Sequence, residues 1–396
     1  MERPQLEVAD IVRAHGPAWR LRQAGHLSLG QLKVLSAIER CRTAELGGHQ
    51  LHCDRCDTDR YAYNSCRNRH CPKCQASAAQ RWLEARQTEL LPIDYFHVVF
   101  TLPEQLRDLA YQNKSVVYDL LFKTVADTLL TIAADPKHLG AKIGVMAVLH
   151  TWGSTLVHHP HLHCIVTGGG CAVDRDEWIR CRPNFFVPVK VLSRLFRGRF
   201  LAALQSAYDN GELKFFGALE ILKDPGWFAE HLRPLKKIDW VVYAKRPFAG
   251  PEAVLTYLSR YTHRVAISNR RLVAFDERGV TFRYKDYRIK SHDRWKSMTL
   301  SADEFLRRFL LHVLPRGFHR IRHYGLFANA ERSDRLHRAR VLLGQPPLAA
   351  TASEQRTEKP SAPCTYTCPA CGSAMIIIRT WLPQCGARAP PSEIAA

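Results

Sequence analysis

The chain is short of acidic side chains and of long apolar runs. Its 396 residues include 37 Asp and Glu against 57 Lys and Arg, which leaves a formal net charge of +20. The longest apolar stretches, such as residues 143–149, fall well below the ~20 residues that span a bilayer. A hydrophobic content of 46% and an aromatic content of 10% are too high for a disordered chain. These features predict a soluble protein of two or three domains with a polyanionic partner.

The sequence also shows no export signal, because it does not open with a basic start followed by an apolar stretch. We therefore expect a cytoplasmic protein. Its 13 cysteines are an odd number, and disulfides are not the main use of cysteine in a reducing compartment.

Two CxxC pairs predict a structural zinc site instead. Cys53 and Cys56 form the first pair, and Cys71 and Cys74 form the second after a gap of 14 residues. Each CxxC turn lets two thiolates converge on one ion, so we expect these four cysteines to hold one tetrahedral Zn²⁺. The alternative ligands that lie between the pairs are Cys66 and His70.

A weaker cysteine motif lies near the C-terminus, at Cys368 and Cys371. Its partners in a second zinc site would have to be Cys364 and Cys385, which do not form a CxxC pair. A degenerate ribbon without metal is the alternative. Residues 345–363 are rich in Pro, Ala, Ser, Thr and Glu and are interpreted as a linker to this segment.

The positive charge is concentrated in residues 261–340, which hold 19 Lys and Arg against 8 Asp and Glu. Aromatic residues are interleaved with these cations. Basic groups neutralise phosphates and aromatic faces stack on unpaired bases, so the segment predicts binding to single-stranded nucleic acid. The side chains expected to contact it are Arg260, Arg264, Arg270, Arg271, Arg283, Lys285 and Arg288.

Hydrophobic periodicity and turn residues predict an α+β fold in which strands are scattered among helices without a regular βαβ alternation. The glycines at 168–170 are expected to close a strand as a turn. Helices are expected within residues 5–45, 77–91, 104–134, 186–208, 217–232 and 302–313 and for three turns after Pro251, and strands within residues 95–102, 142–152, 161–167, 239–245 and 271–300.

A run of histidines at the start of a strand predicts a metal site. His161 and His163 point to the same face because successive strand side chains alternate, and Leu162 points into the core. A third ligand is expected from a neighbouring strand. His150 ends the preceding strand, so a hairpin would bring it beside the pair. His159 shares the parity of the pair and is the alternative.

Two tyrosines follow on a predicted helix. Tyr257 and Tyr261 stand at positions i and i+4, which places them on one helical face. Such a pair in isolation is more typical of an aromatic core stripe. Here cationic neighbours favour a site that receives phosphate, and these neighbours are Arg260, His263, Arg264 and Arg270.

Taken together, the motifs resemble the HUH endonucleases, and most closely the rolling-circle transposases of the insertion-sequence-91-like family. The resemblance covers roughly residues 10–345 in one consistent order. Its segments are residues 63–74, 95–103, 149–153, 158–163, 257–268 and 316–325.

The resemblance implies a fold and a division of the chain. An N-terminal helical and zinc-ribbon module over residues 1–91 precedes an HUH endonuclease domain over residues 92–345, an antiparallel sheet flanked by helices and carrying helical insertions. A linker at 346–363 and a possible degenerate zinc ribbon at 364–396 follow.

The resemblance also implies a chemistry. His161, His163 and His150 would hold Mg²⁺ or Mn²⁺ against a scissile phosphate of single-stranded DNA. Tyr257 or Tyr261 would attack phosphorus, form a 5′-phosphotyrosine and release a 3′-hydroxyl. Such an enzyme would act on element ends and target DNA in the bacterial cytosol.

Two other functions compete with this one. The first is a non-enzymatic, zinc-dependent DNA-binding regulator, which would have no use for both the histidine and the tyrosine motif. The second is a plasmid relaxase or replication initiator, which would not be expected to carry the N-terminal zinc segment.

Overall fold

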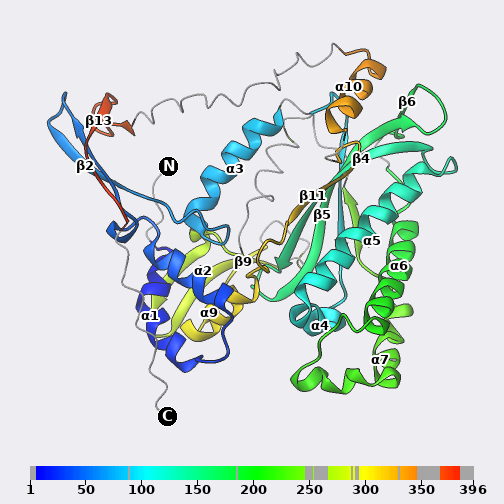
Figure 1. Cartoon of the computed structure of the whole chain (residues 1–396), viewed down its shortest axis with the longest axis horizontal. Coiled ribbons are helices and arrows are strands. Elements are labelled where there is room, and N and C mark those ends of the chain that lie inside the picture. The colour runs from blue at the N-terminus through cyan, green and yellow to red at the C-terminus, as the bar shows by residue number, and fades with distance from the viewer. Residues whose placement is uncertain are drawn as a thin grey trace.

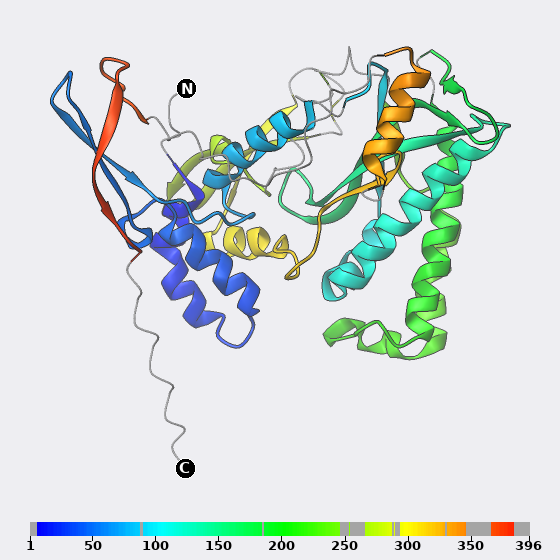
Figure 2. The ribbon, with the colours of Figure 1, turned by 45° about the horizontal axis from the view of Figure 1, so that its top comes forward.

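The structure of the protein, a computed structural model, describes residues 6–87, 90–183, 186–245, 253, 266–286, 289, 294–328, 331–345 and 366–383. Two bodies lie side by side, and helix α3 (Pro72–Gln87) runs between them (Figures 1 and 2). The predicted α+β class, with antiparallel sheets flanked by helices, is confirmed.

The larger body is built on an antiparallel sheet with the strand order β11-β4-β5-β3-β7, and β6 pairs with β5 outside this path. Its longest strands are β4 and β5, which form a hairpin. The strands are β3 (Tyr95–Thr101), β4 (Ala141–Trp152), β5 (His158–Ala172), β6 (Trp178–Arg180), β7 (Val242–Lys245) and β11 (Ile321–Gly325).

Helices α5 (Lys114–Ala134) and α6 (Val189–Asp209) cover one face of this sheet (Figures 1 and 2). Alternate strand residues such as Phe100 and Leu162 are fully buried against them. Burial of one such large apolar side chain contributes about 1.5–3 kcal/mol, so this core fixes which strand residues point inward. Shorter elements that complete the body are η2 (Glu104–Leu106), α4 (Arg107–Gln112), η3 (Gly217–Lys223), α7 (Pro225–Leu232), η4 (Pro234–Lys236) and α10 (Arg332–Leu342).

The second body joins segments from distant parts of the sequence. Residues such as Ile11, Leu35, Phe282 and Phe305 share one core, so the N-terminal helices pack on a sheet that lies more than 200 residues later. Its elements are α1 (Val8–Arg22), α2 (Leu29–Arg40), η5 (Asn269–Arg271), β8 (Leu272–Asp276), β9 (Gly279–Lys285), β10 (Trp295–Leu300) and α9 (Ala302–Leu311).

A four-stranded sheet projects from this second body (Figure 1). It combines the hairpin of β1 (Gly48–Cys53) and β2 (Thr58–Tyr63), which follows η1 (Ala44–Leu46), with β12 (Tyr366–Thr367) and β13 (Ala374–Trp381). β13 pairs antiparallel with β1. The C-terminal segment therefore completes the N-terminal hairpin instead of forming a ribbon of its own.

One predicted helix boundary is wrong for a physical reason. Helix α3 begins at Pro72 and not at residue 77, because proline suits the first turn of a helix, and the second CxxC pair is part of that turn. The segment 217–232, expected to be mostly helical, forms a 3₁₀-helix over residues 217–223 and then α7. The helix predicted after Pro251 lies almost wholly outside the described residues.

The glycines at 168–170 do not end a strand, contrary to expectation. They lie within β5, where Gly170 pairs with Ile143 of β4 and with Ile179 of β6. A Cβ atom on Gly170 would lie 2.2 Å from the carbonyl oxygen of Lys142. Glycine is required there because backbone of the adjacent strand approaches too closely for a side chain.

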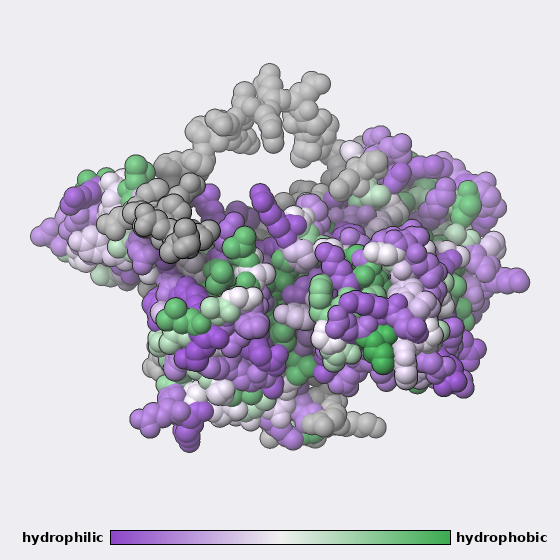
Figure 3. Space-filling view, turned by 60° about the horizontal axis from the view of Figure 1, so that its bottom comes forward, coloured by the Kyte–Doolittle hydropathy of each residue, from purple (hydrophilic) through white to green (hydrophobic). Residues whose placement is uncertain are grey.

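Among the described residues, no helix is long and apolar enough to cross a membrane. Hydrophilic residues cover most of the face seen in Figure 3, and hydrophobic residues are scattered over it in small groups.

Gly170→Ala should destabilise the protein by about 3 kcal/mol, the upper end of the cost of overpacking, because the added methyl group meets backbone on β4. Thermal or urea unfolding measures the change. The matched control is Gly198→Ala in α6, where no atom lies within 4 Å of the added Cβ and alanine favours the helix. Equal stability of the two variants would contradict the packing argument.

Candidate active site

The face of the central sheet that lies opposite α5 and α6 carries a cluster of histidines. His161 and His163 alternate along β5 with Leu162, which is buried in the core on the opposite face. His150 of β4 stands directly opposite His161 in the hairpin. One ring nitrogen of each histidine lies within 4.8 Å of those of the other two. The structure thus brings together the three residues that strand parity predicts as metal ligands.

Hydrogen bonds set the orientation of the two β5 imidazoles. The Nδ1 of His161 donates to the carbonyl oxygen of His159 at 2.7 Å, so the Nδ1 atom carries the hydrogen. The Nδ1 of His163 lies 2.8 Å from the Nε2 of His97. The two Nε2 atoms then face each other at 3.1 Å. When the Nδ1 of His163 carries its hydrogen, both Nε2 atoms present lone pairs toward one position, where they can ligate one cation.

His159, the alternative third ligand, orients His161 through its backbone and does not join the cluster through its side chain. It supplies the carbonyl oxygen that holds His161, and its side chain is not part of the three-histidine cluster. His150 is 2% exposed and stacks on Trp152 with ring centroids 4.6 Å apart. Burial and stacking hold the His150 ring in place beside the pair.

His97 is a member of the site to which the sequence interpretation gave no role. It lies on β3, where Val99 is paired with His163, and its ring stacks on that of His163 with centroids 5.1 Å apart. Burial lowers the pKa of His97 to about 3, so its ring is neutral and can accept the Nδ1 hydrogen of His163. The alternation of Phe96 and Val98 into the core would have placed His97 on the histidine face.

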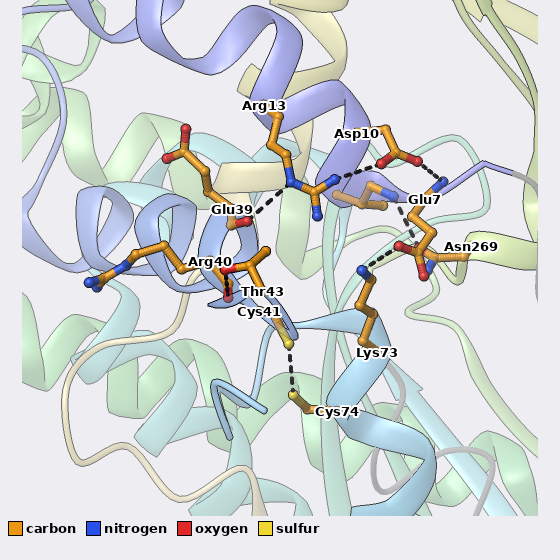
Figure 4. Close-up of polar contacts among 11 residues, drawn as sticks. Glu7, Asp10, Arg13, Glu39, Arg40, Cys41, Thr43, Lys73, Cys74 and Asn269 are labelled. Atoms are coloured by element: carbon orange, nitrogen blue, oxygen red, sulfur yellow. Dashed lines mark hydrogen bonds and ion pairs between the residues drawn. The ribbon is translucent and has the colours of Figure 1, made fainter. Parts of the chain in front are cut away.

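The cysteines are grouped differently from the prediction. Cys71 and Cys74 cluster with Cys41 and Cys66. The Sγ of Cys74 lies 3.6 Å from the Sγ of Cys41 and 3.6 Å from the Sγ of Cys66. Figure 4 shows Cys41, at the end of α2, facing Cys74 at the start of α3. The prediction that one site unites Cys53, Cys56, Cys71 and Cys74 is wrong.

Hairpin length explains the separation. Cys53 and Cys56 form the turn at the tip of β1 and β2, and six residues of strand at ~3.3 Å each carry that turn about 20 Å from the base. Cys66 lies beyond the base, where it meets Cys71. The tip cysteines instead meet Cys368 and Cys371. Cys364 and Cys385 lie outside the described residues.

His70 is not a ligand of either cysteine cluster. Its Nε2 accepts the backbone N–H of Leu314 at 3.2 Å, and burial lowers the pKa of His70 to about 3. The neighbouring Arg69 donates to the carbonyl oxygens of Pro315 and Phe318. These contacts attach the zinc segment to the loop between α9 and β11.

Contacts on the other side attach the same segment to α1. Lys73 forms an ion pair with Glu7, the residue before α1 (Figure 4). The start of α1 is held in turn by η5, because the N–H of Val8 donates to the side chain of Asn269 at 3.1 Å. Cys41, Cys71 and Cys74 themselves belong to the core of the second body. The cysteine cluster is therefore built into the fold and is not an appendage.

The basic residues predicted to contact nucleic acid fall into four groups, of which Arg271 is the last. Arg283 and Lys285 of β9 share the solvent face of the three-stranded sheet with the exposed Trp295, and Arg283 lies over the Trp295 ring at 5.4 Å. Arg270 is exposed at the end of η5. The predicted residues that lie outside the described part of the chain are Tyr257, Arg260, Tyr261, Arg264 and Arg288.

Arg271 does not belong to this surface. It is 8% exposed, and its guanidinium donates to the carbonyl oxygens of Arg283 and Ser154. Because it joins β9 to the β4–β5 connection inside the fold, we do not retain Arg271 as a candidate DNA contact.

Comparison with known proteins supports this view of the chain. A family model described as "Transposase zinc-binding domain" matches residues 11–102, and one described as "Putative transposase" matches residues 144–334. A Sinorhizobium fredii protein, "Putative transposase y4qJ", is 55% identical over 383 residues, 95% of this chain and 96% of that protein. The "Transposase for insertion sequence element IS801" of Pseudomonas savastanoi pv. phaseolicola is 28% identical over 326 residues, 78% of this chain and 73% of that protein. No solved structure matches significantly.

His97→Ala should weaken Mn²⁺ binding to the histidine cluster by about 10- to 100-fold, the usual cost of removing a partner that orients a metal-bound histidine. Calorimetric titration of zinc-loaded protein with Mn²⁺ measures the affinity. His138→Ala, on an exposed turn after α5, is the control and should bind as the wild type does. Unchanged affinity in His97→Ala would show that His97 does not support the site.

Proposed function

Because the chain belongs to the insertion-sequence-91-like transposases with an N-terminal zinc-binding domain, we propose that it nicks and rejoins single-stranded DNA at element ends through a 5′-phosphotyrosine. The observation that carries this proposal is the convergence of His150, His161 and His163 on one sheet face, with the ε nitrogens of the β5 pair 3.1 Å apart. A passive DNA-binding protein would have no use for both this donor set and the tyrosine pair.

We assign His150, His161 and His163 as the ligands of one catalytic divalent cation. When bound, the ion supplies positive charge that polarises the scissile phosphate. Imidazole is a softer ligand than Mg²⁺ usually takes, so Mn²⁺ is the ion expected to support activity best in vitro. His97 and the His159 carbonyl oxygen hold the two β5 rings so that their ε nitrogens face the cation.

The nucleophile in this proposal is Tyr257 or Tyr261. The tyrosine oxygen bonds to phosphorus, the bond from phosphorus to the 3′ oxygen breaks, and that oxygen leaves with a proton as a 3′-hydroxyl. The 5′ phosphate stays on the tyrosine as an ester that retains the energy of the original phosphodiester. A second 3′-hydroxyl can displace the tyrosine, so rejoining needs no ATP. Free tyrosine has a pKa near ~10, so nearby cations must ease its deprotonation.

The solvent face of β9 and β10 is the proposed path of the strand. Arg283 and Lys285 offer charge for phosphates, and Trp295 offers a face on which a base can stack. The hydroxyl of Ser154 donates to the carbonyl oxygen of Lys285 at 2.7 Å. Because Ser154 follows β4, this basic face adjoins the turn between the two histidine-bearing strands.

Incubation with Mn²⁺ and a single strand containing an element end should yield a protein–DNA adduct that survives SDS. The Tyr257→Phe/Tyr261→Phe double variant should form none, because it retains the rings and loses both nucleophilic oxygens. Tyr208→Phe, whose hydroxyl binds the carbonyl oxygen of Lys223 beside α7, is the control and should form the adduct normally. An adduct from the double variant would refute the tyrosine mechanism. DNA binding by the wild type without any adduct would favour a non-enzymatic regulator.

The Arg283→Ala/Lys285→Ala variant should bind single-stranded DNA with a weaker dependence on salt. Each phosphate contact contributes ~0.7 to the slope of log affinity against log salt, so losing two lowers the slope by about 1.4. Fluorescence anisotropy across a salt series measures it. Arg175→Ala, on the exposed turn before β6 where it pairs with Glu177, is the control. An unchanged slope would remove this face from the DNA path.

A further inference from the structure

Cysteines from the two ends of the sequence meet at the tip of the N-terminal hairpin. Cys53 and Cys56 lie at that tip, and Cys368 and Cys371 lie just before β13, about 310 residues later. The four Sγ atoms all lie within 4.8 Å of one another. We propose that these four cysteines hold a second structural zinc ion, which clasps the C-terminal segment onto the hairpin.

The sulfur geometry fits zinc and does not fit disulfides. The Sγ atoms of Cys53 and Cys371 are 3.6 Å apart, far beyond the ~2.05 Å of an S–S bond. A tetrahedron with Zn–S bonds of ~2.3 Å has edges of about 3.8 Å. All four cysteines carry unoxidised thiols in the structure.

Both contributing segments are shaped as metal-binding turns. The N–H of Cys56 donates to the carbonyl oxygen of Cys53 at 3.2 Å, and the N–H of Gly372 donates to that of Cys368 at 2.8 Å. Gly372 has a φ of +73°, a conformation that glycine adopts without strain. Each turn presents its two thiols to the same point, and the pairing of β1 with β13 places the turns face to face.

The apolar contacts of this small sheet are too few to hold the C-terminal segment firmly. Its core has four buried residues among those described, and two of them are zinc-ligand candidates: Leu51, Cys53, Cys368 and Met375. Ile376, Ile377 and Ile378 of β13 are each about half exposed. Small folds with so little buried apolar surface usually depend on a metal or a disulfide for stability.

Aromatic packing favours one position of the C-terminal segment on the hairpin. Trp381 packs edge-on against Tyr61 and Tyr63 of β2, with ring centroids 6.0 and 5.9 Å apart. A metal ion that joins segments so distant in the sequence closes a long loop, and closing a long loop is expected to give a large entropic stabilisation. The zinc ion would thus fix a register that the side chains already specify.

Metal analysis of the full-length protein tests the stoichiometry. Wild type should contain two zinc ions per chain. Cys368→Ser/Cys371→Ser and Cys53→Ser/Cys56→Ser should each contain one, and so should Cys41→Ser, which removes the other ion. Cys181→Ser, a thiol outside both clusters, should retain two. One zinc in wild type, or two in Cys368→Ser/Cys371→Ser, would overturn the proposal.

A second measurement tests the clasp itself. A specific protease site introduced between residues 351 and 360 would separate the C-terminal segment covalently. After cleavage, size-exclusion chromatography should find that segment still bound in wild type and released from Cys368→Ser/Cys371→Ser or after chelation. Retention without zinc would show that zinc does not hold the segment. This inference is independent of the proposed DNA cleavage, because the loss of zinc from the cysteine variants relative to wild type, and the retention of the segment, are measured without DNA or catalysis.

Discussion

Every second residue of β5 must point to the same side of the central sheet, and the candidate active site depends on this alternation. Leu162 and Cys164 are fully buried against the helices on one face, so His161 and His163 are forced onto the other. A slip of one residue would bury two imidazoles and expose two apolar side chains. The hydrophobic core therefore sets the register, and the register sets the position of the histidines.

The same argument extends to the neighbouring strands. β4 pairs His150 with His161, and β3 presents His97 two residues before Val99, the partner of His163. Apolar burial specifies the sheet strongly, whereas a hydrogen bond between imidazoles contributes only about 1 kcal/mol. The polar site is positioned by the apolar core and oriented afterwards by its own hydrogen bonds.

A second constraint concerns buried cations at the joint between the two bodies. Burial lowers the pKa of Lys114 to about 8 and that of Arg320 to about 10, which shows the cost of placing these cations away from water. Lys114 donates to the carbonyl oxygens of Leu311 and Val313, at the negative end of the α9 dipole. Arg320 donates to Gln75 of α3 at 3.1 Å. These bonds offset the desolvation and tie α3, α5 and the loop after α9 together.

The sequence predicted the elements of this fold better than it predicted their partners. Strand parity placed His161 and His163 on one face because the hydrophobic pattern is local, and the short connection between two predicted strands placed His150 beside them. The cysteine grouping failed because it depends on hairpin length and on a segment from the other end of the chain. Cys41 belongs to no CxxC pair, so spacing gave no reason to choose it. His97 lay within reach of the parity argument, since Phe96 and Val98 alternate with it as Leu162 alternates with His161.

The positions of the two cysteine clusters imply that they stabilise different parts of the protein. The cluster of Cys41, Cys66, Cys71 and Cys74 lies in the core of the second body and begins the helix that leads to the central sheet. Arg69, two residues before Cys71, holds the loop that leads into β11. Disorder at this cluster would therefore reach the edge of the central sheet through a continuous set of contacts. Among the described residues, the apolar neighbours of the cluster at the hairpin tip belong to the small projecting sheet. We therefore expect its effect to remain confined to the C-terminal segment and the surface that this segment completes.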